Sequence, residues 1–112
     1  MTFPVVESTT VIGRNGSYVD VDYPAGLSAG DLLVAAMGVN GSGDHVWPGA
    51  WTRARYASVG SQSFSVAYTV ADGTESGTFL ADYVGSARIE VICYRISGAS
   101  GAVEAATPAT GT

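Results

Sequence analysis

The sequence contains no lysine, a single cysteine and a single histidine among its 112 residues. All five cationic side chains are arginines, and ten carboxylates bring the formal net charge to −5. Nucleic-acid binding draws its affinity from clustered lysine and arginine, so this charge balance argues against a nucleic-acid partner. The lone cysteine, Cys93, excludes an intrachain disulfide and lies in an apolar run, where we expect a small buried core residue.

Long hydrophobic runs are also missing. The longest, residues 32–39, is too short to cross a bilayer, so we expect no membrane insertion. The first residues lack the basic and apolar regions of a secretory signal peptide, which indicates folding in a cytoplasm unless the chain belongs to a larger protein. With 15 glycines and 13% charged residues, the composition is typical of one turn-rich globular domain rather than a coiled coil or a disordered tail.

Short β-strand patterns are present instead. Residues 3–12 are rich in β-forming side chains and lead into the Asn15-Gly16 dipeptide, which predicts a hairpin turn. Residues 17–23 then alternate, with apolar side chains on one face and Asp20 and Asp22 on the other. We therefore expect two strands joined by a hairpin, the second with one face in water.

Two segments in the middle of the chain give the strongest strand signals. Residues 32–39 are uniformly apolar between glycine-containing turns and predict a central strand covered on both faces. Residues 62–70 alternate regularly. One face carries Phe64, Val66, Tyr68 and Val70, and the other carries Ser63, Ser65, Ala67 and Thr69. We expect the Ser/Thr face to lie outside, either solvated or as an assembly surface.

The last strand signals lie at residues 78–83 and 87–97. In the second segment Ile89, Val91 and Cys93 share one face. The opposite face begins with charged side chains and ends with apolar ones. We therefore expect one end of that outer face to be covered by another sheet or another subunit.

These patterns predict an all-β fold without amphipathic helices. About seven to nine short strands, with turn signals about every eight to twelve residues, favour a single antiparallel β-sandwich. A jelly-roll-like arrangement is our first choice and an immunoglobulin-like one our second. The predicted sandwich domain covers residues 1–97, and residues 98–112 have the Gly/Ala/Thr-rich composition of a linker or extended tail.

The side chains that could bind a ligand cluster around a glycine-rich loop. His45 follows Asp44 directly, and two tryptophans bracket a Pro-Gly turn, an arrangement that could stack on a sugar ring. The candidate binding residues are Asn40, Asp44, His45, Trp47 and Tyr56. The competing interpretation places His45 at a solvated loop or rim and Trp51 in the core, and it leaves Trp47 undecided.

We predict no cofactor, no metal site and no enzymatic activity. One histidine without a nearby thiolate falls short of a zinc site, and Asp20 and Asp22 lack the third oxygen ligand of a calcium loop. The glycine-rich loop lacks the Lys-Ser/Thr of a phosphate-binding loop. The chain has no Gly-x-Ser-x-Gly elbow, and Asp20 and Asp22 share one exposed strand face rather than the cleft that hydrolysis by paired carboxylates needs.

From residue 23 onward the chain reads YPAGLSAGDLL, a glycine-rich loop, PGAWT, an alternating tyrosine-bearing strand, GTE and an apolar strand ending in Tyr94-Arg95. Over residues 19–98 this order resembles a group of β-sandwich domains in bacteriophage virion proteins and bacterial surface proteins. Their chains read PAG…AGDLLLA, PAGWT and AYRG. Two departures are WPGAWT for PAGWT and Tyr-Arg-Ile-Ser for Tyr-Arg-Gly. The resemblance implies a β-sandwich, no catalytic residues and often a similar second half after a Thr/Ala-rich connection.

Two functions follow as hypotheses. The first is a structural virion protein of a phage or phage-like particle, such as a capsid decoration, head spike, fibre or tail component. It would assemble with other virion proteins and with copies of itself, and would reside in the virion after synthesis in the host cytoplasm. The alternative is a carbohydrate-binding or adhesion module that recognises cell-surface glycans, located at a cell surface as part of a larger protein.

Overall fold

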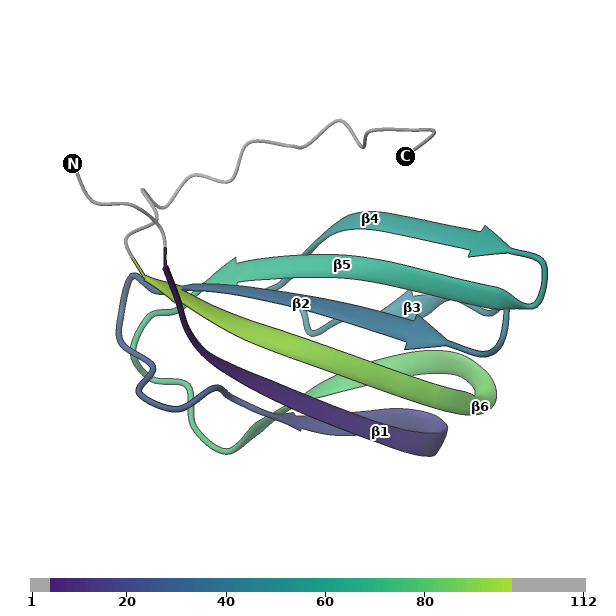
Figure 1. The fold of residues 1–112 in the computed structure, drawn as a ribbon, viewed down its shortest axis with the longest axis horizontal. Helices are drawn as coiled ribbons and strands as arrows, with labels where there is room; N and C mark the ends of the chain where they lie inside the picture. The colour runs from purple at the N-terminus through teal and green to yellow at the C-terminus, as the bar shows by residue number, and fades with distance from the viewer. Residues whose placement is uncertain (1–4, 98–112) are drawn as a thin grey trace.

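The computed structural model describes residues 5–97 and contains six β-strands (Figure 1). They are β1 (Val5–Asp22), β2 (Leu32–Val39), β3 (His45–Val46), β4 (Thr52–Val59), β5 (Gln62–Val70) and β6 (Thr78–Ser97). Every strand pair is antiparallel. Within residues 5–97 no helix is long and apolar enough to span a membrane. The predicted tail at residues 98–112 lies outside the described residues.

The two longest strands, β1 and β6, pair with each other as an antiparallel ribbon. It runs from Val5 opposite Ser97 to Asp22 opposite Thr78, with register shifts between Val6 and Ser8 and between Gly16 and Tyr18. Both strands turn back at the same end of the molecule (Figure 1). At the bend Gly16 and Gly85 have φ angles of 150° and 139°. Residues with a Cβ rarely adopt such angles, so glycine permits the turn in both strands.

The bent ribbon makes the sheet fold over itself into two layers. The larger layer has the order β1-β6-β2-β5-β4 and uses residues 5–16 and 87–97 of the ribbon. The smaller layer contains residues 18–22 and 78–82, with β3 paired to β6. The structure therefore confirms the predicted all-β, antiparallel fold, with the two layers arranged as a β-sandwich.

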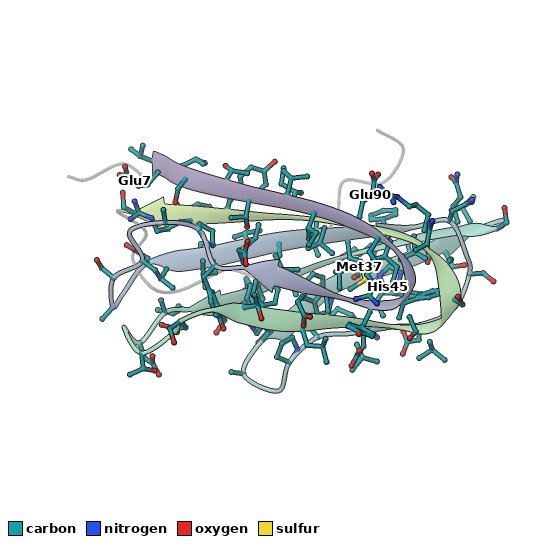
Figure 2. All side chains as sticks on the ribbon, turned by 90° about the horizontal axis from the view of Figure 1, so that it is seen from below. Glu7, Met37, His45 and Glu90 are labelled. Atoms are coloured by element: carbon teal, nitrogen blue, oxygen red, sulfur yellow. The ribbon has the colours of Figure 1, made fainter. Side chains whose placement is uncertain are left out.

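Both layers contribute alternate side chains to one core. Val19, Val21 and Ala81 from the smaller layer are fully buried against Leu33 and Met37 from the larger one. Asp20 and Asp22 are exposed, as the alternation of this segment predicted. Ile89, Val91 and Cys93 also face inward, which confirms the predicted inner face of residues 87–97. Figure 2 shows Met37 between the layers and Glu90 on the outer side.

The predicted hairpin at Asn15-Gly16 is wrong. Both residues lie inside β1, where they pair with Arg88 and Ala87 of β6. The glycine bends one long strand and does not join two short ones. The segments 78–83 and 87–97 are likewise one strand with a bend between them. A local turn signal was overridden because both halves of β1 pair with the same distant strand.

The segment at residues 32–39 forms β2, the central strand of the larger layer, as predicted. Its inward side chains Leu33, Ala35 and Met37 are fully buried. Its outward side chains are partly exposed, and Gly38 is exposed. The core therefore covers β2 on its inner face alone, whereas we predicted cover on both faces.

The expected orientation of β5 is wrong. Ser63, Ser65 and Ala67 point into the core with exposures of 4%, 0% and 0%, whereas Phe64 and Val70 are 50% and 40% exposed. The Ser-bearing face is the inner one and the aromatic face is the outer one. The surface of the larger layer that points away from the core is called the outer face below.

We expect a lysine to report this orientation directly. Ser65→Lys would place a charge in the core and should unfold the domain, because an unpaired buried charge costs several kcal/mol, a large share of the roughly 5–15 kcal/mol that stabilises a domain. Phe64→Lys should change the free energy of unfolding by less than about 1 kcal/mol, since that side chain is half exposed. Urea unfolding followed by tryptophan fluorescence measures both. If Phe64→Lys proved the more damaging variant, the orientation would be the reverse.

Candidate functional site

The predicted site residue His45 begins β3 and is buried between the layers (Figure 2). Its Nδ1 lies 2.7 Å from the Ser65 hydroxyl and its Nε2 lies 2.8 Å from the Ser63 hydroxyl. Ser63 donates to the Gly41 carbonyl at 2.6 Å, and the Trp47 indole N–H donates to the Ser65 hydroxyl at 3.0 Å. The two serines and the imidazole thus form one connected polar network in the core.

One arrangement of protons satisfies every member of this network. Ser63 uses its proton on the Gly41 carbonyl, so it accepts from His45 Nε2–H. Ser65 accepts from Trp47 and can donate its own proton to the bare Nδ1. This favours the neutral Nε2–H tautomer of His45, because a charged ring would make Ser65 accept twice and leave its proton without an acceptor in the network. Among the described residues no buried side-chain nitrogen or oxygen lacks a hydrogen-bond partner.

The surroundings of His45 also favour the neutral form. Burial lowers its pKa below the usual value of 6.5, an effect that the Asp44 carboxylate opposes and Arg53 reinforces. The edges of Tyr56 and Tyr83 pack around the ring, with centroids 5.2 and 6.0 Å away. His45 is therefore a satisfied core histidine, and its expected place at a solvated loop or rim is corrected.

The glycine-rich loop at residues 40–44 packs closely on the smaller layer. Gly43 donates to the Tyr83 hydroxyl at 2.9 Å and accepts from the Tyr56 hydroxyl at 3.0 Å. A Cβ at Gly43 would collide with the Val84 carbonyl oxygen, and one at Gly41 with the Tyr83 hydroxyl. Glycine is needed here for close approach. Tyr56 thus holds the loop in place.

Asp44 and Asn40 are the exposed members of the predicted set. Asp44 accepts from Arg53 at 2.7 Å, and this contact holds the pKa of its carboxyl below the usual range. Arg53 also donates to the His45 carbonyl at 2.9 Å. The Asn40 backbone donates to Arg88 at the opposite end of the loop. The loop brings Asp44, His45 and Tyr56 together, while Asn40 lies apart.

The two tryptophan rings pack on each other and are largely shielded from solvent. Trp47 and Trp51 are each 9% exposed, stack with centroids 5.7 Å apart and both contact the Phe79 ring. Trp51 closes the core as expected, and the undecided Trp47 lies there too. Neither indole presents an open face to a sugar ring.

A second polar contact connects distant parts of the chain. Arg95 on β6 donates to Asp31 at 3.0 Å and to Ser8 on β1 at 3.1 Å, and the backbone N–H of Ser28 donates to the same carboxylate. The Ser28 and Arg95 bonds lower the pKa of Asp31. Sequence reasoning missed this ion pair, although both partners belong to the quoted motifs AGDLL and Tyr-Arg. Those motifs therefore have an architectural role in this chain.

The largest feature that sequence reasoning missed is the apolar outer face. Cross-strand register places its side chains in four rows. The rows are Val6, Ile96, Leu32 and Val70; Tyr94, Val34 and Tyr68; Val11, Ile92, Ala36 and Val66; and Glu90, Gly38, Phe64 and Ala57. The apolar end predicted for β6 is one strip of this surface. Val11, Phe64 and Val6 are 70%, 50% and 54% exposed.

Other reactive groups are few in the part of the chain that the structure describes. No group of three or more His, Cys, Asp or Glu side chains there could hold a metal ion. Cys93 is free and buried, and burial raises the pKa of its thiol to about 12. A thiol with such a pKa is unreactive at neutral pH.

No family model matches the chain, and neither the characterised proteins nor the solved structures contain a match.

The buried histidine predicts how stability depends on pH. The folded-state pKa of His45 lies below its unfolded value of 6.5, so the unfolded chain binds the extra proton first. Stability should be full above about pH 6.5 and fall as the pH drops below that value, until the folded protein also binds the proton. Urea midpoints on either side of pH 6.5 measure the effect.

His45→Gln keeps hydrogen-bonding groups but cannot titrate, and it serves as the matched control. It should be less stable at pH 7.5 by about 1–3 kcal/mol and nearly insensitive to pH over the same interval. The pKa values of Asp31, Asp44 and Asp72 are lowered from 3.8 in the folded protein. Protonation of these carboxyls therefore reduces stability at a more acidic pH than protonation of His45 does. Equal pH slopes in the two proteins would contradict a neutral buried His45.

Proposed function

We propose that the chain is a structural protein of a bacteriophage or phage-like particle that acts through protein–protein assembly. The observation that supports this most is the apolar outer face of the larger layer. Large apolar patches on soluble domains mark sites where another molecule binds. Here the apolar side chains extend across neighbouring strands of one nearly continuous surface.

The arrangement of polar residues supports the same proposal. β5 places Ser63 and Ser65 in the core and Phe64 and Val66 outside. A solvated strand would normally present the polar set to water. Burying serines while exposing a phenylalanine is favourable when the outer face is covered in the assembled state, because that contact removes the apolar area from water.

The smaller layer differs in character. Its outer side carries Asp20 and Asp22 as exposed carboxylates, which suits a surface in contact with water. The exposed apolar side chains there, Leu80 and Val46, pair with Asp20 and Asp82, so the surface of the smaller layer mixes charged and apolar groups. A subunit that packs against its neighbours through one face and remains in solvent on the other has this asymmetry.

The resemblance to phage virion domains is the reason that we propose a virion particle as the assembly. A capsid decoration, head spike, fibre or tail component assembled from several copies would use such a face. The glycan-binding alternative stays a prediction, and its motif is weakened here because both indoles are buried.

We expect the chain to copurify with particles from its source. Mass spectrometry of density-gradient fractions, with electron microscopy of the particle band using a specific antibody, should find it in a fixed ratio to the other particle proteins. Recovery in secreted or cell-wall fractions alone would contradict the proposal.

Two matched variants test whether incorporation of the chain into particles depends on the outer face. Phe64→Glu charges the outer face and should abolish incorporation, whereas Leu80→Glu charges the outside of the smaller layer and should leave it unchanged. Their wild-type side chains are similarly exposed, at 50% and 42%. Equal incorporation of both variants would exclude the outer face as the assembly surface.

A further inference from the structure

The outer face contains a hollow next to a projecting ring. Two adjoining hollows of about 440 and 380 Å³ share Gly38, Phe64 and Glu90 in their lining. A Cβ placed on Gly38 would meet nothing within 4 Å, so the missing side chain leaves open space. Phe64 stands beside it on β5 as its direct cross-strand partner and is half exposed. The face therefore has a cavity and a side chain that could fill one, side by side.

We propose that this face binds the same face of a second copy, with each Phe64 inserted into the Gly38 hollow of the other copy. The inference rests on the proposed assembly function and specifies its partner. The two-fold axis lies between the faces, parallel to the strands, and passes between β2 and β5. Because Gly38 and Phe64 are opposite each other in one row, this axis places Gly38 of one copy over Phe64 of the other.

The same axis matches the rest of the face. It places β2 over β5 of the second copy and β6 over its β4. Val34 then packs on Tyr68, and Leu32 packs on Val70, in both copies at once. A two-fold interface uses one patch twice and must be complementary to itself. In three rows a smaller side chain on β2 is paired with a larger one on β5, namely Gly38 with Phe64, Ala36 with Val66 and Val34 with Tyr68, and these rows meet the requirement.

The charges on the face are complementary under this axis as well. Glu90 lies in the Gly38 row on β6, and Arg55 pairs with Val66 in the neighbouring row on β4. Within one copy two strands lie between them and they are one row apart, so their backbones are about 16 Å apart at the usual strand spacing and rise. Across the axis they become diagonal neighbours. In the described residues the ion pair of Glu90 is with Arg88, at 3.6 Å, and Arg55 makes no ion pair.

The overlapping area is compatible with a dimer. Under this axis β1 has no strand opposite it, and the four overlapping strands, about eight residues long, spaced about 4.8 Å apart with a rise of about 3.4 Å per residue, present roughly 520 Å². Two such faces bury roughly 1,050 Å² in total, just above the roughly 1,000 Å² that a specific interface should exceed. Sheets that pack face to face in sandwiches lie about 10 Å apart, a gap that one layer of interdigitated side chains fills.

The test is sedimentation velocity of the full chain at concentrations up to about 100 µM, with charge-swap variants. Glu90→Arg and Arg55→Glu should each raise the dimer dissociation constant by about tenfold or more, because each creates like-charge contacts twice per dimer. The double variant should recover to within about threefold of the original value. Leu80→Ala, on the smaller layer, is the control and should not change it.

Two variants probe the hollow and the ring independently of charge. Gly38→Phe fills the hollow and Phe64→Ala removes the ring, so both should yield monomers, while thermal unfolding by circular dichroism shows that they remain folded. A monomeric wild-type chain, or a double charge variant no better than the single ones, would overturn the pairing. Monomers that still enter particles would overturn this inference alone, whereas dimers never found in particles would overturn the proposed function alone.

Discussion

The imidazole of His45 lies between the hydroxyls of Ser63 and Ser65, and this contact decides which face of β5 points inward. Side chains alternate along a strand, so a shift of one residue would exchange the whole inner set for the outer one. If Phe64 and Val66 faced inward, His45 and the Trp47 indole N–H would lose their partners in the core. An unpaired buried polar group costs about 1–3 kcal/mol, and this network contains several. The polar contacts therefore outweigh the hydrophobic preference of one strand.

This orientation has a consequence on the other side of the sheet. Once the serines are inside, the aromatic and β-branched side chains of β5 join those of β2 and β6 on the outer face. The core is complete without them, because Val19, Met37, Ile89 and Val91 already fill it. The core thus does not need the apolar side chains of the outer face, and they are available for contact with another subunit. The proposed assembly function follows from where the fold places its apolar surface.

The sequence predicted the segments of β2 and β5 and most of β1 and β6, the central position of residues 32–39, the alternation around Val19 and Val21, and the burial of Cys93. It did not predict β3 or β4, and its seven to nine short strands are six in the described residues. It did not predict the continuity of β1, because the partner that extends the strand through Asn15-Gly16 lies about 70 residues away. The face of β5 was misjudged for a similar reason. Hydrophobicity alone favours Phe64 inside, and the histidine that reverses this lies 18–20 residues earlier. Of the candidate site, the cluster of Asp44, His45 and Tyr56 was found, but the burial of His45 and Trp47 depends on contacts that no local pattern contains.

The buried network, the apolar outer face and the proposed assembly all depend on the orientation of β5. A nuclear Overhauser spectrum of the labelled protein measures this orientation most directly. Cross-peaks are predicted from the His45 ring to the β-protons of Ser63 and Ser65, with none from the Phe64 ring to the methyl groups of Val19 or Val91. Cross-peaks from the Phe64 ring to those core methyls, with none between His45 and Ser65, would contradict the buried network and the apolar outer face together.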